Sequence, residues 1–181
     1  MNVIGLTGKA GSGKDTVASF LKEDGWVCIA FADALKHICI DYLGLTENDV
    51  YTQQGKEQYN NFWQMTNREI LQKMGTDALR NHFCKEIWTK IAELKIKSLL
   101  RQGKRVVITD VRFDNEAEFV RQFGGKVFEI RRTNSNSNLS QAEQQHESEQ
   151  GVNADLVDRI IDNSGTLDDL RLKTKEVSYH G

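Results

Sequence analysis

Short apolar runs alternate with amphipathic segments along most of this chain. Apolar runs predict strands at residues 2–6, 26–31, 105–110, 126–130 and 159–162. The run at 105–110 has a continuous apolar centre, which is typical of a strand covered on both faces. Strands separated by helices favour a parallel sheet with right-handed crossovers. We therefore expect an α/β fold with a central five-stranded parallel sheet flanked by helices.

Helical spacing of apolar residues recurs between the strands. It predicts helices at residues 14–23, 33–43, 67–82, 84–100 and 116–123, and a last helix that begins after Thr166. In the segment 33–43, the residues at helical spacing are Leu35, Ile38, Cys39 and Tyr42. In the segment 84–100 they are Cys84, Ile87, Trp88, Ile91 and Leu94. In the last helix we expect an inward face of Leu167, Leu170, Thr174 and Val177.

Two polar segments interrupt this pattern. Residues 44–64 are rich in Gln and Asn, and their structure is hard to assign. Residues 133–150 are almost free of apolar side chains, which indicates a mobile loop or lid. No internal repeat or linker divides the chain, so we expect a single domain over residues 1–181.

Composition narrows the class of protein. The chain has 181 residues, 39% of them hydrophobic and 28% charged, with a formal net charge of -2. This charge argues against a partner that is a nucleic-acid polymer. No apolar run is long enough to span a membrane, and no secretory leader is visible. Cys28, Cys39 and Cys84 are too widely spaced for a metal pair or a disulfide framework, so we expect buried, reduced thiols in a cytoplasmic protein.

The strongest chemical signal is a glycine-rich loop between the first strand and the first helix. Glycines allow backbone N–H groups to converge on phosphates, the helix N-terminus adds partial positive charge, and a lysine neutralises the β and γ phosphates. A Rossmann loop has a different glycine spacing, and an unliganded turn would need no lysine. We therefore expect ATP to bind at Gly8, Ala10, Gly11, Ser12, Gly13, Lys14, Asp15 and Thr16.

The residue after Lys14 is unusual for such a loop. A hydroxyl there normally binds Mg²⁺, but this chain has Asp15, followed by the hydroxyl of Thr16. A carboxylate also ligates Mg²⁺, directly or through water, and the sequence does not distinguish the two residues. Asp110, at the end of the third strand, is a further candidate for Mg²⁺ or its waters.

The remaining signals favour a small kinase. No Asn-Lys-x-Asp segment of a GTPase is present, and the chain is short for a motor core. A kinase needs cationic groups that hold a second anion beside the γ-phosphate. Arg112 follows the third strand and suits a phosphate. The alternative for Asp110 is a helix cap.

Other candidates lie at strand ends and on one helix. Arg131 and Arg132 follow the fourth strand, and Arg132 is expected to close over the triphosphate, whereas a solvated pair is the alternative. Asp33 is a candidate to orient the acceptor and Lys36 to bind its phosphate; the alternative is a helix cap and an exposed lysine. Arg68, Gln72 and Arg80 line either an acceptor pocket or a solvated helix face.

In these motifs the chain resembles the phage-type deoxynucleoside monophosphate kinases. The resemblance follows the chain in order through residues 4–16, 31–36, 68–77, 109–116, 146–149 and 161–167. The Gly-Lys-Asp-Thr loop and the Asp-x-Arg segment are specific together, whereas His146 and Glu149 belong to a weak segment, and their roles stay open. Ala34 departs from the family, which often has proline there.

The resemblance implies a P-loop nucleoside-monophosphate-kinase fold with a helical acceptor-binding region, at about residues 44–82, and a lid, at about 131–152. It also implies ATP and Mg²⁺ as cofactors. Lys36, Arg68, Gln72, Asp110 and Arg112 would serve the acceptor, and Lys14, Arg112, Arg132 and Asp33 would be catalytic. A viral or bacterial host cytoplasm fits such a kinase. The preferred base and the oligomeric state, a homodimer included, stay open.

Two other classes of function remain. The first is a kinase for a different phosphorylated metabolite: animal-type phosphomevalonate kinases look like distant relatives, and dephospho-coenzyme A kinase is a more remote option on the same fold. The second is an ATP-binding regulatory module without turnover.

Overall fold

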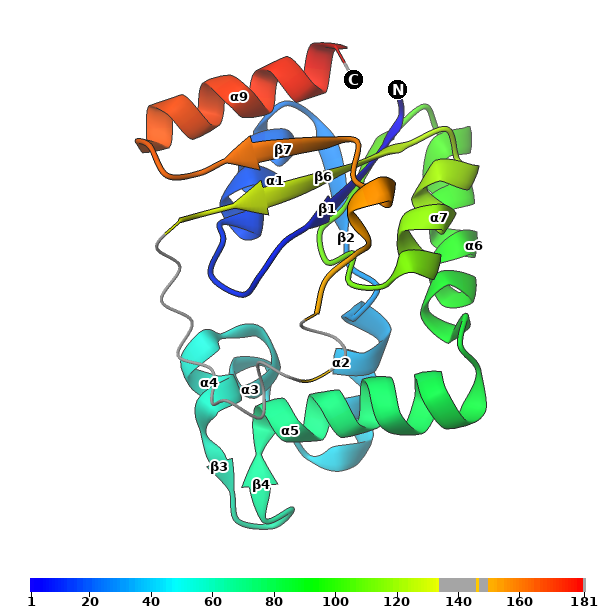
Figure 1. The fold of residues 1–181 in the computed structure, drawn as a ribbon. Coiled ribbons are helices and arrows are strands. Elements are labelled where there is room, and N and C mark those ends of the chain that lie inside the picture. The colour runs from blue at the N-terminus through cyan, green and yellow to red at the C-terminus, as the bar shows by residue number, and fades with distance from the viewer. Residues whose placement is uncertain (134–145, 147–149, 181) are drawn as a thin grey trace. The chain divides into compact units, whose positions relative to one another are not determined.

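The computed structural model describes residues 1–133, 146 and 150–180 (Figure 1). All five strands of its main sheet are parallel, in the order β2-β5-β1-β6-β7. The strands are β1 (Val3–Thr7), β2 (Trp26–Ile29), β5 (Arg105–Ile108), β6 (Lys126–Arg131) and β7 (Arg159–Asp162). This confirms the predicted fold class, with strand ends within two residues of the expected ones. The fully buried β1 is the central strand, as expected for the apolar run that precedes the glycine-rich loop.

The compact unit around this sheet comprises Met1–Ala30 and Ala92–Gly181. Helices α1 (Lys14–Glu23) and α9 (Leu167–His180) cover one face, and α7 (Asp114–Gln122) covers the other (Figure 1). A short 3₁₀ turn, η3 (Ala154–Leu156), precedes β7. The core beneath α1 and α9 contains Ile4, Leu21, Val107 and Ile130, among others.

The inward face predicted for the last helix is right except at its first residue. Leu170, Thr174 and Val177 are buried, but Leu167 is 61% exposed. Leu167 is the first residue of this helix, and its side chain borders a cavity described below and is not packed in the core.

Helix α6 spans Ile87–Arg101, where a helix over residues 84–100 was predicted. Its buried face is rotated relative to the predicted apolar stripe. Its buried residues are Trp88, Ala92 and Ile96, four apart, whereas Ile91 and Leu94 are exposed. The indole N–H of Trp88 donates to the carbonyl of Gly75 at 3.1 Å, which fixes Trp88 inward. The predicted stripe was therefore right at Trp88 and wrong at Ile91 and Leu94, because two apolar stripes overlap in this segment.

Residues Phe31–Ile91 form a second compact unit. It contains α2 (Asp33–Leu43), α3 (Glu47–Tyr51), α4 (Gln53–Glu57), the hairpin β3 (Tyr59–Asn60) and β4 (Met65–Thr66), α5 (Asn67–Gln72) and the π-helix η1 (Lys73–Phe83). The predicted acceptor-binding region, residues 44–82, lies within this unit. That the whole chain acts as one kinase domain stays a prediction.

Local capping explains the segment that the sequence left unassigned. Thr46 and Asp49 form a reciprocal capping box at the start of α3, and the hydroxyl of Thr52 accepts from the backbone of Gly55 in α4. Thr66 and Glu69 form the same box at the start of α5. Short polar helices of this kind have no apolar stripe, so periodicity did not reveal them.

The helix predicted over residues 67–82 changes character after Gln72. It is an α-helix to that point and a π-helix from Lys73 to Phe83. Gly75 lies against Leu35, where an added Cβ would approach Leu35 Cδ2 to 2.5 Å. The α2 side chain Leu35 therefore packs closely on this glycine, and a larger residue here would require Leu35 to move. Wide helical turns of this type are often found at functional sites.

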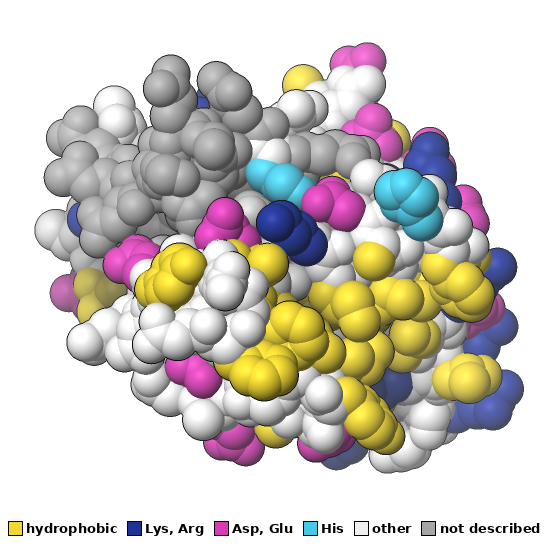
Figure 2. Space-filling model, turned by 90° about the horizontal axis from the view of Figure 1, so that it is seen from below, with side chains coloured by type: hydrophobic (Ala, Val, Ile, Leu, Met, Phe, Trp, Pro, Cys, Tyr) yellow, Lys and Arg dark blue, Asp and Glu magenta, His cyan; other side chains and the backbone are white. Residues whose placement is uncertain are grey.

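Several aromatic side chains of the second unit face solvent. Tyr42, predicted on the apolar side of its helix, is 82% exposed, and Phe62 and Phe83 are exposed as well. Figure 2 shows a face on which hydrophobic side chains gather. In α2 only Leu35 and Cys39 of the predicted stripe are buried, because the helix contacts its neighbours along a narrow strip.

The cysteines are free thiols, with Cys39 buried and the other two half-buried. Burial raises the pKa of the Cys39 thiol to about 11, so it stays protonated near neutral pH. Within the described part of the chain, no helix has the length and apolar character needed to cross a membrane. Most of the predicted lid, residues 134–145 and 147–149, lies outside the described residues.

Candidate active site

The glycine-rich loop has the geometry of a phosphate-binding loop. It leaves the carboxyl end of the central strand β1 and enters α1 at Lys14. Gly8 has φ +133°, and a Cβ there would lie 2.3 Å from the carbonyl oxygen of Ile130. Only glycine fits such a backbone, so the loop turns sharply against β6. The backbone N–H groups at the start of α1 are then available to an anion.

Two features inside the loop suit the binding of an anion. The ammonium of Lys14 donates to the carbonyl oxygens of Gly8 at 2.6 Å and Lys9 at 2.9 Å, so it lies folded over the loop. The hydroxyl of Ser12 is buried and has no hydrogen-bond partner among the residues that the structure describes. A buried polar atom of this kind is rare in proteins and fits a loop built around a ligand.

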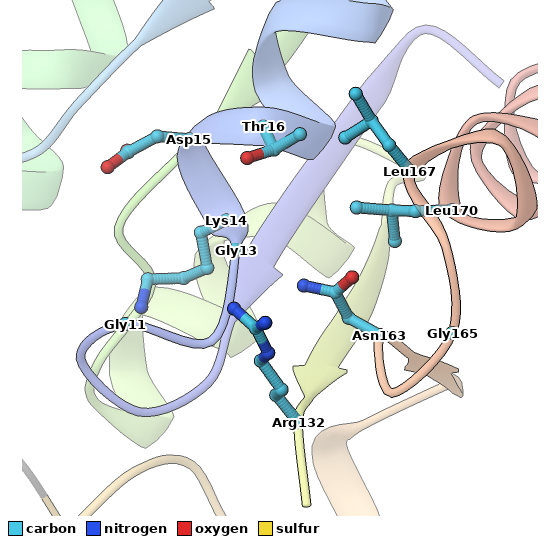
Figure 3. Close-up of a pocket in the computed structure, with 10 residues that line it drawn as sticks. All are labelled: Gly11, Gly13, Lys14, Asp15, Thr16, Arg132, Asn163, Gly165, Leu167 and Leu170. Carbon is cyan, nitrogen blue, oxygen red and sulfur yellow. The ribbon is translucent and has the colours of Figure 1, made fainter. Parts of the chain in front are cut away.

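A cavity of about 400 Å³ opens beside the loop (Figure 3). Gly11, Gly13, Lys14, Asp15 and Thr16 line it from the loop and α1. Opposite them, Arg132 extends its guanidinium toward the loop, and the segment after β7 contributes Asn163, Gly165, Leu167 and Leu170. The cavity thus brings together most of the residues predicted to bind the triphosphate, and it has an apolar wall at Leu167 and Leu170.

Arg131 and Arg132 have different surroundings, although they are neighbours in sequence. Arg131 is exposed and makes a two-point ion pair with Glu129, with nitrogen–oxygen distances of 3.2 and 2.8 Å. This partner raises the pKa of Arg131. Arg132 instead lines the phosphate cavity. Of the two, Arg132 is the candidate for a triphosphate contact.

Asp110 and Arg112 lie on the loop that follows β5. The backbone N–H of Thr109 donates to Ile29, and that of Val111 donates to Leu6, so the loop spans the carboxyl ends of β2 and β1. Arg112 lines a second cavity of about 230 Å³, together with Gly8 and Lys9 of the phosphate loop. The same cavity also contains Glu129 and Arg131, which pair with each other.

A buried carboxyl group is hydrogen-bonded to the backbone of this loop. Glu116, in the first turn of α7, accepts hydrogen bonds from the backbone N–H groups of Arg112 at 2.8 Å and Phe113 at 3.2 Å. Burial, and next the charge of Asp110, raise the pKa of Glu116 to about 8, against the opposing effect of those two hydrogen bonds and the charge of Arg112. No role for Glu116 was predicted from the sequence.

The candidate metal ligands of the phosphate loop lie at the edge of the phosphate cavity. Among the described residues, no three His, Cys, Asp or Glu side chains are clustered as a metal-binding group. Asp15 and Thr16 offer oxygen atoms at the edge of the phosphate cavity. Mg²⁺ often keeps several waters and binds through one or two protein oxygens plus substrate phosphates, so the donor set fits this metal. Which of the two residues would bind it stays open.

The second unit contains the other predicted residues. The ammonium of Lys36 lies 4.4 Å from the centroid of the Tyr51 ring, a cation–π contact. Burial, and then the charges of Asp33 and Glu47, raise the pKa of Tyr51, so Asp33 is near enough to act on this side chain electrostatically. Lys36 and Asp33 therefore share one neighbourhood.

The charged residues of α5 and η1 are not a solvated helix face. Arg68 is only 7% exposed and Arg80 only 6%, and Gln72 between them buries its amide nitrogen. Arg80 donates to the side chain of Asn81 at 3.1 Å. The burial of Arg68 and Arg80 is inconsistent with the alternative of a solvated helix face, and their binding of an acceptor stays a prediction.

Several residues that line these cavities were not among the predicted site residues. Asn163 was seen only as part of a family motif, Lys9 was passed over inside the loop, and Leu167 was predicted on the inward face of the last helix. The signal for Asn163 was its position directly after a strand, where parallel sheets gather their ligands. Of the weak segment at 146–149, His146 is half-buried and Glu149 lies outside the described residues.

The fold and the loop define the class of protein, an α/β protein with the P-loop architecture. Comparison with solved structures agrees on the fold: a dephospho-CoA kinase from Campylobacter jejuni superposes with a TM-score of 0.56 at 21% sequence identity, over 98% of this chain and 95% of that one. At this identity the likeness concerns the fold alone.

Sequence comparison then gives the family. The family model for deoxynucleotide monophosphate kinase matches residues 42–174. A putative deoxynucleotide monophosphate kinase of Acanthamoeba polyphaga mimivirus is 39% identical over 144 residues, which are 73% of this chain and 75% of that protein. The deoxynucleotide monophosphate kinase of Enterobacteria phage T4 is 29% identical over 60% of this chain and 43% of the phage protein. The chain belongs to the deoxynucleotide monophosphate kinase family and is a phosphotransferase.

Proposed function

We propose that this protein transfers the γ-phosphoryl group of ATP to a deoxynucleoside 5′-monophosphate, giving ADP and the deoxynucleoside diphosphate. The observation that carries the proposal is the phosphate loop at the end of β1, with Lys14, Arg132 and a cavity of about 400 Å³ beside it. Family membership supports the choice of acceptor.

In this proposal the chain contributes position and charge. An oxygen of the acceptor phosphate attacks the γ-phosphorus, and the bond from that phosphorus to the bridging oxygen of ADP breaks. The attacking phosphate is already anionic, so no general base is needed. Lys14 and Arg132 would balance charge on the transferring group and on ADP, and Arg112 would hold the acceptor phosphate.

Magnesium, when bound with ATP, would supply positive charge that offsets the negative charge of the phosphates. Asp15 or Thr16 would hold it from the loop, and Asp110 would orient its waters. In the second unit, Lys36, Arg68 and Gln72 would bind the acceptor, and Asp33 would orient it. Burial of Arg68 supports this assignment, because a buried guanidinium is a strong site for a phosphate or a base.

The acceptor is tested with a panel of substrates. ADP release from ATP and Mg²⁺ would be measured with each of the four common deoxynucleoside monophosphates, their ribose counterparts, phosphomevalonate and dephospho-CoA. We expect turnover with one or more deoxynucleotides and little with the last two. Lys14→Ala serves as the control for a contaminating kinase. Turnover with dephospho-CoA or phosphomevalonate alone would contradict the proposal, and ATP binding without any product would indicate a regulatory module.

Arg112→Ala separates the acceptor from the donor. Because Arg112 would make a charge-assisted bond to the acceptor phosphate, its loss should raise the acceptor KM roughly 10- to 100-fold and leave the KM for ATP nearly unchanged. The matched control is Arg121→Ala, on the same stretch of chain, where the arginine is partly exposed and pairs with Asp158. An equal loss for ATP and acceptor would assign Arg112 to the donor side or to the fold.

A further inference from the structure

Asn163 joins three segments of the phosphate cavity. It follows β7 directly, at the carboxyl end of the sheet, and lines the cavity (Figure 3). Its backbone N–H donates to the carbonyl of Arg131 at 2.7 Å, at the end of β6 next to Arg132. Its side-chain amide donates to the carbonyl of Ser12 at 2.8 Å, across 151 residues of sequence. One residue thus connects β7, the end of β6 and the phosphate loop.

Two sets of bonds shape the loop from within. The backbone N–H of Ser12 donates to the carbonyl of Lys9 at 3.2 Å, and the ammonium of Lys14 donates to the carbonyls of Gly8 and Lys9. When phosphates bind, that ammonium must turn to them and leave those carbonyl oxygens. The bond from Asn163 to Ser12 does not use Lys14, so it can hold the loop before and after the nucleotide enters.

The position of that bond matters for an anion. A trans peptide group points its C=O and N–H in opposite directions. When the Ser12 carbonyl is held toward Asn163, the N–H of Gly13 is fixed on the opposite side. The amide donor also offsets the partial negative charge of a carbonyl oxygen beside the phosphates. The contact is so close that a Cβ on Gly13 would lie 2.3 Å from the Asn163 amide nitrogen.

We infer that Asn163 is a positioning residue, which holds the phosphate loop in the shape that binds the phosphates of the donor nucleotide. The inference rests on the proposed function in one respect, that this loop binds ATP. Because Asn163 contacts the loop backbone, its loss should weaken the binding of any ligand whose phosphates occupy the loop, whether or not that ligand carries a base.

The test uses Asn163→Ala and Asn163→Asp in the whole chain. Removal of one hydrogen bond should raise the KM for ATP roughly 3- to 10-fold, with the acceptor KM unchanged. Asn163→Asp should be worse, since a carboxylate is nearly isosteric but repels both the Ser12 carbonyl and phosphate. Inorganic tripolyphosphate, used as an inhibitor competing with ATP, should lose affinity by about the same factor as ATP.

The control is Asn153→Ala, an exposed asparagine whose side chain accepts from the backbone of Asp155 away from this cavity. It should leave both affinities unchanged. An unaltered KM for ATP in both Asn163 variants, in an active wild-type background, would overturn the inference. So would weaker ATP with unaltered tripolyphosphate, which would mean contact with the nucleoside. If the wild type neither binds ATP nor turns over, the proposed function fails instead, and thermal unfolding of each variant separates these results from misfolding.

Discussion

Lys14→Ala is expected to reduce turnover by about 10²- to 10³-fold, the range seen when one group that stabilises transition-state charge is removed. The ammonium is the cation of the phosphate loop, and in the structure it lies folded over the Gly8 and Lys9 carbonyl oxygens. When ATP binds, it would turn to the β and γ phosphates, where charge shifts during transfer. Much of its effect would therefore fall on kcat.

Folding should be affected far less. The two hydrogen bonds of Lys14 are on a partly exposed side chain, and bonds of this kind contribute about 1 kcal/mol or less to stability once water competes. The thermal unfolding midpoint of Lys14→Ala should therefore stay close to that of the wild type. The reason to expect a separation of rate from stability is that Lys14 contributes charge to the site and little to the core.

Steady-state ADP release and ATP binding would be measured side by side on the purified variant. The matched control is Lys22→Ala, an exposed lysine in the last turn of the same helix, which should keep wild-type turnover. Wild-type turnover in Lys14→Ala would remove the basis for calling this loop the site of phosphoryl transfer.

The sheet and the phosphate loop were predictable because their signals are local. A buried parallel strand is a short apolar run, and the P-loop is a short continuous segment with glycines at fixed spacing before a lysine. The strand Val3–Thr7 was therefore predicted to within one residue, and the loop from Gly8 to Thr16 was predicted directly after it. The loop after β5 was found for the same reason, since Asp110 and Arg112 follow directly on an apolar run.

Features that depend on contacts far apart in sequence were not predictable. Asn163 acquires its place only because β7 lies beside β6, which lies beside β1, and this brings it to Ser12. The exposure of Leu167 and Leu94 depends on where each helix begins and how it rotates against its neighbours. The change from α-helix to π-helix after Gln72 has no signal in the apolar spacing, which continues through residues 67–82.

The role of Glu116 depends both on its position in the sequence and on its burial in the fold. Its position one turn after Arg112 was visible, but its burial and its pKa of about 8 come from the fold. A neutral carboxyl group at this place can still accept from the backbone N–H groups of Arg112 and Phe113, and it holds the loop that carries Asp110 and Arg112. The loop therefore depends on a group whose ionised form is costly in the folded state.

The stability of the protein should consequently fall as the pH rises through this group. The pKa of Glu116 is raised above its value of 4.5 in the unfolded chain, so its contribution is fully present below about pH 4.5 and is lost as the pH approaches 8. At most about 1.4 kcal/mol of unfolding free energy should be lost per pH unit in that window. Glu116→Gln, which keeps the shape and an acceptor oxygen but cannot ionise, should not show this loss.

Urea unfolding at several pH values between 4.5 and 9 would measure the effect, with the exposed Glu118→Gln on the same helix as the control. Wild type and Glu116→Gln should have similar stability at the acid end and diverge toward pH 8, with the variant more stable. Parallel curves would mean that Glu116 is ionised throughout, held so by the two N–H groups and Arg112. In that case the carboxylate would act as a permanent anchor of the Arg112 loop, and Glu116→Gln would weaken it at every pH.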